Sequence, residues 1–270
     1  MLDATLHTPI MQRAKGRADV GFGVHGLKTL YQSGCAKVLL PQNFQPVPEA
    51  VFINTSGGAT GGDRLVYSAS VQEHAALTVT TQAAERIYRA SSGVAHITNR
   101  LTLAADSRLE WLPQETILFE GAALKRRIDV EMDKTSELLA LEMLVLGRRA
   151  MGETLQQARL SDQWRIRRNG RLIYADGLRF SEPRSETQSR ATFNGQRALA
   201  TLVYVAPDAE DRIASVRSLL NFEGVEAAAS AWSGLLVVRF LAPDAQPLRA
   251  ALISFLTAFR GGDLPRVWHM

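Results

Sequence analysis

Hydrophobic and polar residues alternate along much of the chain between residues 65 and 205. In residues 127–132, for example, Ile128, Val130 and Met132 alternate with three charged residues. Successive side chains of a β-strand point to opposite faces of a sheet, so an alternation with a period of two is typical of half-buried strands. Residues 96–103 show the same alternation, with Asn99 at one of the apolar positions. These segments predict a body built of many strands.

Residues 138–146 break this alternation because they are almost wholly apolar, with Glu142 as the exception. Such a run is typical of a strand buried on both faces, and a short buried helix fits the same pattern. The dipeptide Asn169-Gly170 predicts a hairpin between two strand-like segments, because both of its residues tolerate a positive φ. Shorter strands are expected at residues 17–24, 29–31, 37–40, 51–53, 65–67, 77–80, 200–206 and 235–241.

Two segments near the C-terminus have the apolar spacing of helices. Residues 208–221 carry acidic residues in the first turn, where the helix dipole favours negative charge. Residues 246–260 follow Asp244 and end just before Gly261, an arrangement typical of helix ends. No segment rich in Gly, Ser or Pro divides the chain. We therefore expect a single domain over residues 1–270, with a loosely ordered start at residues 1–16 and two C-terminal helices on a β body.

The composition excludes several classes of site. The net charge of the 270 residues is only +4, and the basic clusters lack interleaved aromatic residues, which argues against a nucleic-acid interface. The single cysteine, Cys35, rules out an internal disulfide and a Cys-x-x-Cys site, and the five histidines form no His-Glu-x-x-His pair. Because no apolar run is long enough to cross a bilayer and no signal-type segment is found, we expect a cytoplasmic protein without a membrane partner.

The most conspicuous local motif is the glycine-rich segment 54–64, which holds four glycines within residues 57–62 and is followed at once by Asp63. It lacks the Lys-Ser/Thr pair of a phosphate-binding loop, and the extended residues after it do not form the helix that a dinucleotide fingerprint requires. Two interpretations stay open. The segment is either a binding loop that holds the Asp63 carboxylate over a channel, or a tight connection between two strands.

Four blocks of the sequence and its ending resemble a known family. The blocks are SGGATGGD (residues 56–63), TTQAAERIYR (80–89), LEWLPQETILFEGA (109–122) and LGRRAMGE (146–153), and the ending is LPRVW (264–268). Together they resemble the urease accessory protein family UreD, called UreH in some bacteria, over nearly the whole chain. The third block is the most specific. The chain departs from the family in small ways, such as His269 in place of the usual Thr after the final Trp.

The resemblance implies a fold, a function and partners. The implied fold is mainly β, an elongated β-helix-like or stacked-sheet body with two C-terminal α-helices. The implied function is that of a non-enzymatic maturation factor that binds apo-urease and UreF, and through UreF also UreG, and that helps deliver nickel to the urease active site. No tightly bound cofactor is implied, only transient Ni²⁺ that passes through the interior of the protein.

A route that hands a metal ion on needs weak, successive ligands, mostly oxygen atoms, since binding must allow both entry and exit. Carboxylates in apolar or glycine-rich surroundings are therefore the candidates. We expect Asp63, Glu142, Asp176 and Glu115 to line the route, with Glu85 and Glu153 as further candidates. The alternative for each is a salt bridge to one of the 26 arginines. For Glu142 this alternative and the metal-facing role are equally open, because an unpaired buried carboxylate is costly.

Trp268, two residues from the end, is a candidate anchor for a partner, because tryptophans often dominate interfaces, and a place in the core is the alternative. Two other functions compete with the metal-route hypothesis. One is a hydrolase built around Asp63, with Glu115 or Glu120 as an acid–base pair, although no nucleophile motif such as Gly-x-Ser-x-Gly is present. The other is a pure interaction scaffold without metal transfer, which the sequence does not separate from the first hypothesis.

Overall fold

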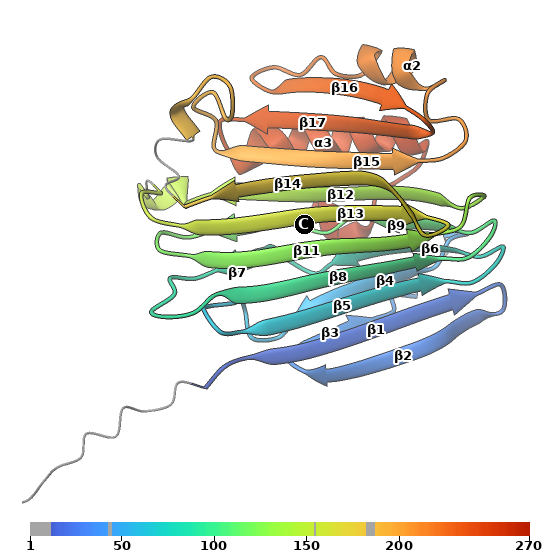
Figure 1. Cartoon of the computed structure of the whole chain (residues 1–270), viewed down its shortest axis with the longest axis horizontal. Coiled ribbons are helices and arrows are strands. Elements are labelled where there is room, and N and C mark those ends of the chain that lie inside the picture. The colour runs from blue at the N-terminus through green and yellow to red at the C-terminus, as the bar shows by residue number, and fades with distance from the viewer. Residues whose placement is uncertain (1–11, 43–44, 154, 182–186) are drawn as a thin grey trace, which may run out of the picture.

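The chain folds into two β-sheets that pack face to face, with a helix behind the second sheet (Figure 1). The computed structural model describes residues 12–42, 45–153, 155–181 and 187–270. Sheet A has the strand order β14 (Arg171–Phe180), β13 (Arg159–Arg168), β11 (Ala123–Met132), β8 (Ala95–Leu103), β5 (Arg64–Val71), β1 (Lys15–Gly23) and β2 (Gly26–Gly34).

Sheet B lies behind sheet A in the view of Figure 1, and one end of sheet B extends past the edge of sheet A at β14. Its order is β16 (Glu226–Trp232), β17 (Leu235–Ala242), β15 (Ala198–Val205), β12 (Glu137–Leu146), β9 (Arg108–Trp111), β6 (Ala76–Thr81), β4 (Glu49–Asn54) and β3 (Ala36–Leu39). Two short strands also belong to it, β10 (Thr116–Leu118) beside β12 and β7 (Glu85–Ile87) beside β10. The expectation of a mainly β, stacked-sheet body is confirmed.

The middle of the chain winds between the two sheets like a solenoid, so that each turn adds one parallel strand to each sheet. Within sheet A, Arg64 pairs with His96, Ala95 with Leu124 and Ala123 with Arg159, which gives advances of 32, 29 and 36 residues. Because the connections between strands differ in length, the solenoid leaves no fixed period in the sequence.

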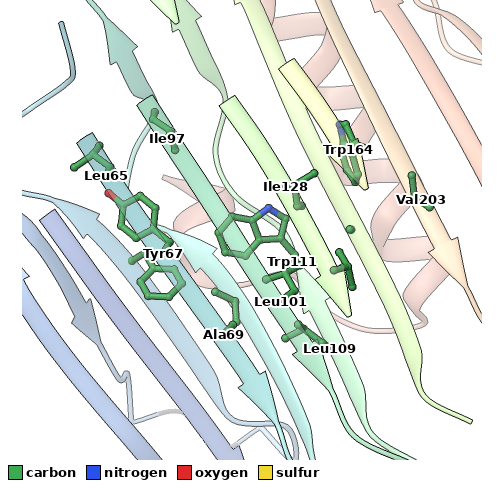
Figure 2. Close-up of a cluster of buried hydrophobic side chains, with 14 of the residues drawn as sticks. Leu65, Tyr67, Ala69, Ile97, Leu101, Leu109, Trp111, Ile128, Trp164 and Val203 are labelled. Carbon is green, nitrogen blue, oxygen red and sulfur yellow. The ribbon is translucent and has the colours of Figure 1, made fainter. Parts of the chain in front are cut away.

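The main core fills the space between the sheets. Figure 2 shows its central part, where Tyr67, Ile97 and Leu101 of sheet A face Trp111 of sheet B. A second core lies on the outer face of sheet B, beneath α3 (Ala245–Arg260) and α2 (Ile213–Ser218). β12 is in contact with both cores, which explains why residues 138–146 are apolar on both faces and confirms the strand over the buried-helix alternative.

The predicted helix at residues 246–260 is confirmed as α3. Its ends are formed by the expected residues: the Asp244 side chain accepts a hydrogen bond from the N–H of Ala245, and Gly261 follows the last helical residue with a φ of 69°. The helix predicted at 208–221 is much shorter, since α2 begins only at Ile213. Its expected first-turn acids bind elsewhere: Asp208 accepts from the Tyr204 hydroxyl, and Glu210 accepts from backbone N–H groups of the β16–β17 turn.

The Asn169-Gly170 hairpin between β13 and β14 is confirmed, with φ values of 50° and 75° at the two turn residues. Two short 3₁₀ helices, η1 (Arg149–Met151) and η2 (Arg266–His269), complete the fold. Of the predicted loose start at residues 1–16, residues 1–11 lie outside the described part of the chain, whereas Lys15 and Gly16 already belong to β1. None of the helices in the described ranges is long and apolar enough to span a membrane.

Candidate functional site

Glu142 occupies the middle of β12 at a position whose side chain points between the sheets. Leu138, Ala140, Leu144 and Leu146, at the same register, all belong to the core between the sheets. The Glu142 carboxylate is buried, and its Oε1 accepts hydrogen bonds from Trp111 Nε1 at 3.0 Å and Asn99 Nδ2 at 3.1 Å. Its other oxygen, Oε2, accepts from Arg126 Nη1 at 2.5 Å. Glu142 is therefore held by partners from both sheets.

Arg126 is the cation at the centre of this cluster. It lies on β11 at an inward-facing position and is only 3% exposed. Its Nε and Nη2 bind the two oxygens of Asp162 on β13 at 3.0 and 2.5 Å, which is a bidentate pair. Its Nη1 contacts Glu142 and also donates to Thr116 Oγ1 at 2.9 Å. One guanidinium thus joins two carboxylates inside the protein.

The surroundings of the cluster alter its protonation equilibria. Burial raises the pKa of the Glu142 carboxyl above its usual range, although Arg126 acts against that rise. Burial also works to lower the pKa of the Arg126 guanidinium, but Asp162 and Glu142 outweigh it and raise that pKa, so the guanidinium stays charged. The cluster combines a permanent positive charge with two carboxylates.

A cavity of about 270 Å³ extends from the surface to this cluster. At its outer end lie three exposed residues: Gly57 of the glycine-rich segment, Ala83 of the segment before β7, and Arg86 of β7. At its inner end lie Asn99, Trp111, Thr116, Arg126 and Glu142. Within the described ranges, two buried side-chain atoms lack a hydrogen-bond partner, Asn99 Oδ1 and Gln114 Nε2, and both residues line this cavity.

A second cavity, of about 90 Å³, lies on the other side of the cluster. It shares Arg126 and Glu142 with the first cavity and is lined further out by Asp162, Asp176 and Arg239. Asp176 on β14 pairs with Arg239 on β17 at 2.7 Å, and Arg239 is exposed. The two cavities therefore meet at the Arg126–Glu142 pair, one on each side of it.

The structure brings two of the four predicted route carboxylates, Glu142 and Asp176, to this pair of cavities. Asp63 is buried elsewhere, where its two oxygens accept from the N–H groups of Ala14 and Thr60, both at 2.8 Å. These bonds shape the glycine-rich turn. Glu115 also lies away from both cavities and pairs with Arg249 on α3 at 3.3 Å. For these two residues the observed contacts are structural.

The remaining predicted residues have clear positions too. Trp268 is 1% exposed, and its Nε1 donates to the Leu112 carbonyl, so the side chain belongs to the core beneath α3 and offers no surface to a partner. Glu153 pairs with Arg148 near the surface. Glu85 lines the first cavity, where burial raises the pKa of its carboxyl to about 7, the nearby Asp63 adds to the rise, and a hydrogen bond from Asn54 opposes it.

Sequence reasoning missed Arg126 and Asp162, although a signal was present. Both are charged residues at apolar positions of an alternating strand: Arg126 lies between Leu124 and Ile128, and Asp162 lies between Leu160 and Trp164. A charge on the apolar side of a strand predicts a buried partner, because an unpaired one is costly. The described residues contain no group of three or more His, Cys, Asp or Glu side chains that could hold a metal ion.

Comparison with known proteins identifies the family. The UreD urease accessory protein family matches residues 14–269. The chain belongs to the UreD family. The urease accessory protein UreD of Rhizobium etli is 49% identical over 265 residues, which cover 96% of each chain. The UreD proteins of Rhizobium leguminosarum bv. viciae and of a Jannaschia species are 47% and 46% identical, the latter over the whole of both chains. Membership of the UreD family supports a role in the maturation of urease.

Proposed function

We propose that the protein is a non-enzymatic, cytoplasmic metallochaperone scaffold of urease maturation. In this role it binds apo-urease and UreF, and through UreF also UreG, and Ni²⁺ passes through its interior as cargo on the way to the urease active site. The observation that carries the metal route is the pair of cavities that meet at the buried carboxylate Glu142. Two cavities that lie on either side of one carboxylate and are lined with further oxygen ligands suit passage better than storage.

The chemistry of the lining supports a cargo that is passed on. Glu85, Glu142 and Asp176 follow one another from the first cavity to the second. Carboxylate oxygens bind Ni²⁺ less firmly than imidazole or thiolate groups do, so each station holds the ion only briefly. Among the residues that the structure describes, no histidine lines either of the two cavities that meet at Glu142.

The experiment compares Glu142→Gln with a matched control on β11 of the facing sheet, Glu131→Gln, whose carboxylate is exposed. Both variants are co-expressed with urease and the other accessory proteins in cells that lack the native gene, and complex formation and urease activity are measured. We expect both variants to co-purify with the partners, and urease activity to fall at least tenfold with Glu142→Gln only.

Two other outcomes would change the proposal. Full activity with Glu142→Gln in an intact complex would favour the alternative function, a pure interaction scaffold without metal transfer. A failure of the unmodified protein to co-purify with apo-urease and UreF would contradict the proposed partners.

A further inference from the structure

The buried cluster at the meeting point of the cavities carries more negative than positive charge. Arg126 supplies one positive charge, and it faces two carboxylates, Asp162 and Glu142, both at most 10% exposed at the side chain. Because the bidentate contact neutralises Asp162, the charge of an ionised Glu142 has no full counterion. A buried site with a surplus negative charge is costly unless a proton or another cation balances it.

The hydrogen bonds show which contact can be exchanged. Arg126 is fixed on Asp162 through Nε and Nη2, and only Nη1 reaches Glu142. The Nη1 contact with Glu142 can therefore be lost while the guanidinium stays neutralised by Asp162. Nη1 also keeps a second partner, Thr116 Oγ1, so it is not left without an acceptor.

The first cavity offers oxygen atoms to whatever replaces Nη1. Asn99 Oδ1 is an unpartnered acceptor on a side chain that is 3% exposed, and it lines the same cavity as Glu142 and Thr116. A free acceptor is costly when buried, and an amide oxygen and a carboxylate oxygen are ligands that suit a hydrated divalent cation. Water in a cavity of this size can supply the remaining ligands.

We propose that Glu142 holds either Arg126 or a divalent cation, so that Arg126 is a barrier that closes the route when no cation is present. The proposal rests on the proposed function, and it adds the way in which the route is closed. A cation that enters from the first cavity binds Glu142 and Asn99 and displaces the Nη1 contact with Glu142, while Thr116 and Asp162 keep their hydrogen bonds from Arg126. Beyond it, Asp176 provides the next oxygens, and Arg239 is the counterion of Asp176.

The closed state follows from electrostatics. A guanidinium between two cavities repels any cation that lacks a ligand to compensate it, in the way that an arginine excludes cations from a pore. With Glu142 held by Arg126, the two cavities are separated by that pair. Ions then enter only as far as the first cavity unless they bind Glu142 more strongly than Nη1 does.

The test measures Ni²⁺ binding to the purified full chain, without a histidine tag, by equilibrium dialysis. The main variant is Arg126→Met combined with Asp162→Asn, which removes one positive and one negative charge and so leaves the net charge unchanged. We expect it to bind Ni²⁺ at least tenfold more tightly than the unmodified protein, and a further Glu142→Gln change to abolish that gain. Arg126→Lys keeps the barrier charge and should bind Ni²⁺ as weakly as the unmodified protein does.

Asp162→Asn alone gives a second test if the main variant does not fold. Arg126 then has only Glu142 as a carboxylate partner, so the barrier becomes stronger. We expect urease activation to fall at limiting nickel and to recover in excess nickel, while complex formation is unchanged. A merely structural role of Asp162 would not give recovery by nickel.

The outcomes separate this proposal from the proposed function. Equal Ni²⁺ affinity of the unmodified protein and the Arg126→Met/Asp162→Asn variant would overturn the barrier, and so would a gain that persists without Glu142. If the barrier is overturned in this way but Glu142→Gln still loses urease activation, the proposed nickel route through Glu142 remains supported. Tighter Ni²⁺ binding in the double variant, together with full activation by Glu142→Gln, would support the exchange at Glu142 and contradict the route.

Discussion

At the scale of single residues, the Arg126 cluster is a case in which the number of charges decides how much each residue contributes to stability. Removing Glu142 leaves Arg126 and Asp162 as a neutral bidentate pair, whereas removing Arg126 leaves two carboxylates buried without a counterion. The two changes therefore differ in kind, although each breaks the same ion pair.

We predict that Glu142→Gln lowers the free energy of unfolding by about 1 kcal/mol, the value of a typical lost hydrogen bond. Arg126→Met should lower it by about 3 to 5 kcal/mol, because it leaves uncompensated buried charge. Urea denaturation at neutral pH measures both. Equal losses in the two variants would show that the surplus charge lies elsewhere than on Glu142.

Glu85 gives the protein a pH-dependent stability. Burial raises the pKa of its carboxyl to about 7 in the folded chain, from an unfolded value of 4.5, so the folded state binds the proton more tightly than the unfolded state does. The resulting stabilisation is complete below the unfolded pKa and is lost as the pH rises through the folded pKa.

We predict that Glu85→Gln abolishes this dependence. The variant and the unmodified protein should be similarly stable at pH 4.5, and the variant should be more stable at pH 8 by about 3 kcal/mol, the equivalent of the pKa shift. Thermal melts across this pH range, with the exposed Glu131→Gln as a control, measure the difference. If the difference in stability between the variant and the unmodified protein is the same at pH 4.5 and at pH 8, the raised pKa of Glu85 is contradicted.

At the scale of elements, the glycine-rich segment after β4 forms the outer end of the first cavity. A Cβ atom at Gly58 would lie 2.6 Å from the Arg86 carbonyl oxygen and would also collide with the ring of Tyr88. At the neighbouring Gly57, a Cβ would meet no atom within 4 Å, although φ is 75°. Backbone conformation alone requires a glycine at position 57, whereas at Gly58 both the lack of space and a φ of 150° require one.

We predict that Gly57→Ala costs about 1 kcal/mol, the strain of a left-handed residue. Gly58→Ala should cost about 3 kcal/mol, because the segment must move away from β7. It should also reduce urease activation by changing the entrance of the cavity, whereas Gly57→Ala should not. Denaturation curves and activation assays on the two variants measure these effects, and equal activation by both would show that this entrance is not used.

The elements also show how far sequence patterns reach. The strands, the hairpin at Asn169-Gly170 and α3 follow from local periodicity and capping residues, because those signals act within a few residues. The helix α2 is shorter than its pattern predicts, since its acids bind the Tyr204 hydroxyl and the turn that contains Gly234. The two partners of Glu210 lie 23 and 24 residues away in the sequence and cannot be read from a local pattern.

The same limit applies to the candidate site. Glu142 was recognisable because its neighbours in the sequence are apolar, but its partners on β8, β9 and β11 depend on how the solenoid coils stack. Asp63 and Glu115 had equally suggestive surroundings, and only the three-dimensional contacts show that they bind a turn and α3 instead. Register between coils is set by connections of unequal length, which no period in the sequence reveals.

At the scale of the whole molecule, the C-terminus closes the second core. η2 follows α3 and returns the chain to sheet B, where Trp268 Nε1 donates to the Leu112 carbonyl at 3.1 Å and the Trp268 carbonyl accepts from Arg249 at 2.9 Å. The guanidinium of Arg249 also lies 5.4 Å from the centre of the Trp268 ring. The last residues therefore hold α3 against the sheet.

We predict that Trp268→Ala lowers the free energy of unfolding by about 4 kcal/mol, the usual cost of truncating a buried tryptophan. For a chain of this size the melting temperature should fall by about 10 °C. His269→Ala is the matched control, because His269 is exposed whereas the adjacent Trp268 is buried. This variant should change the melting temperature little. Circular dichroism melts measure both.

The same pair of variants separates stability from partner binding. Because Trp268 is buried beneath α3, Trp268→Ala should still bind apo-urease and UreF at temperatures well below its melting temperature. A loss of binding by a folded Trp268→Ala protein would mean that the C-terminus leaves the core in the complex and contacts a partner directly. Retained binding would place the partner surfaces elsewhere, on parts of the molecule that stay in place when the C-terminal anchor is weakened.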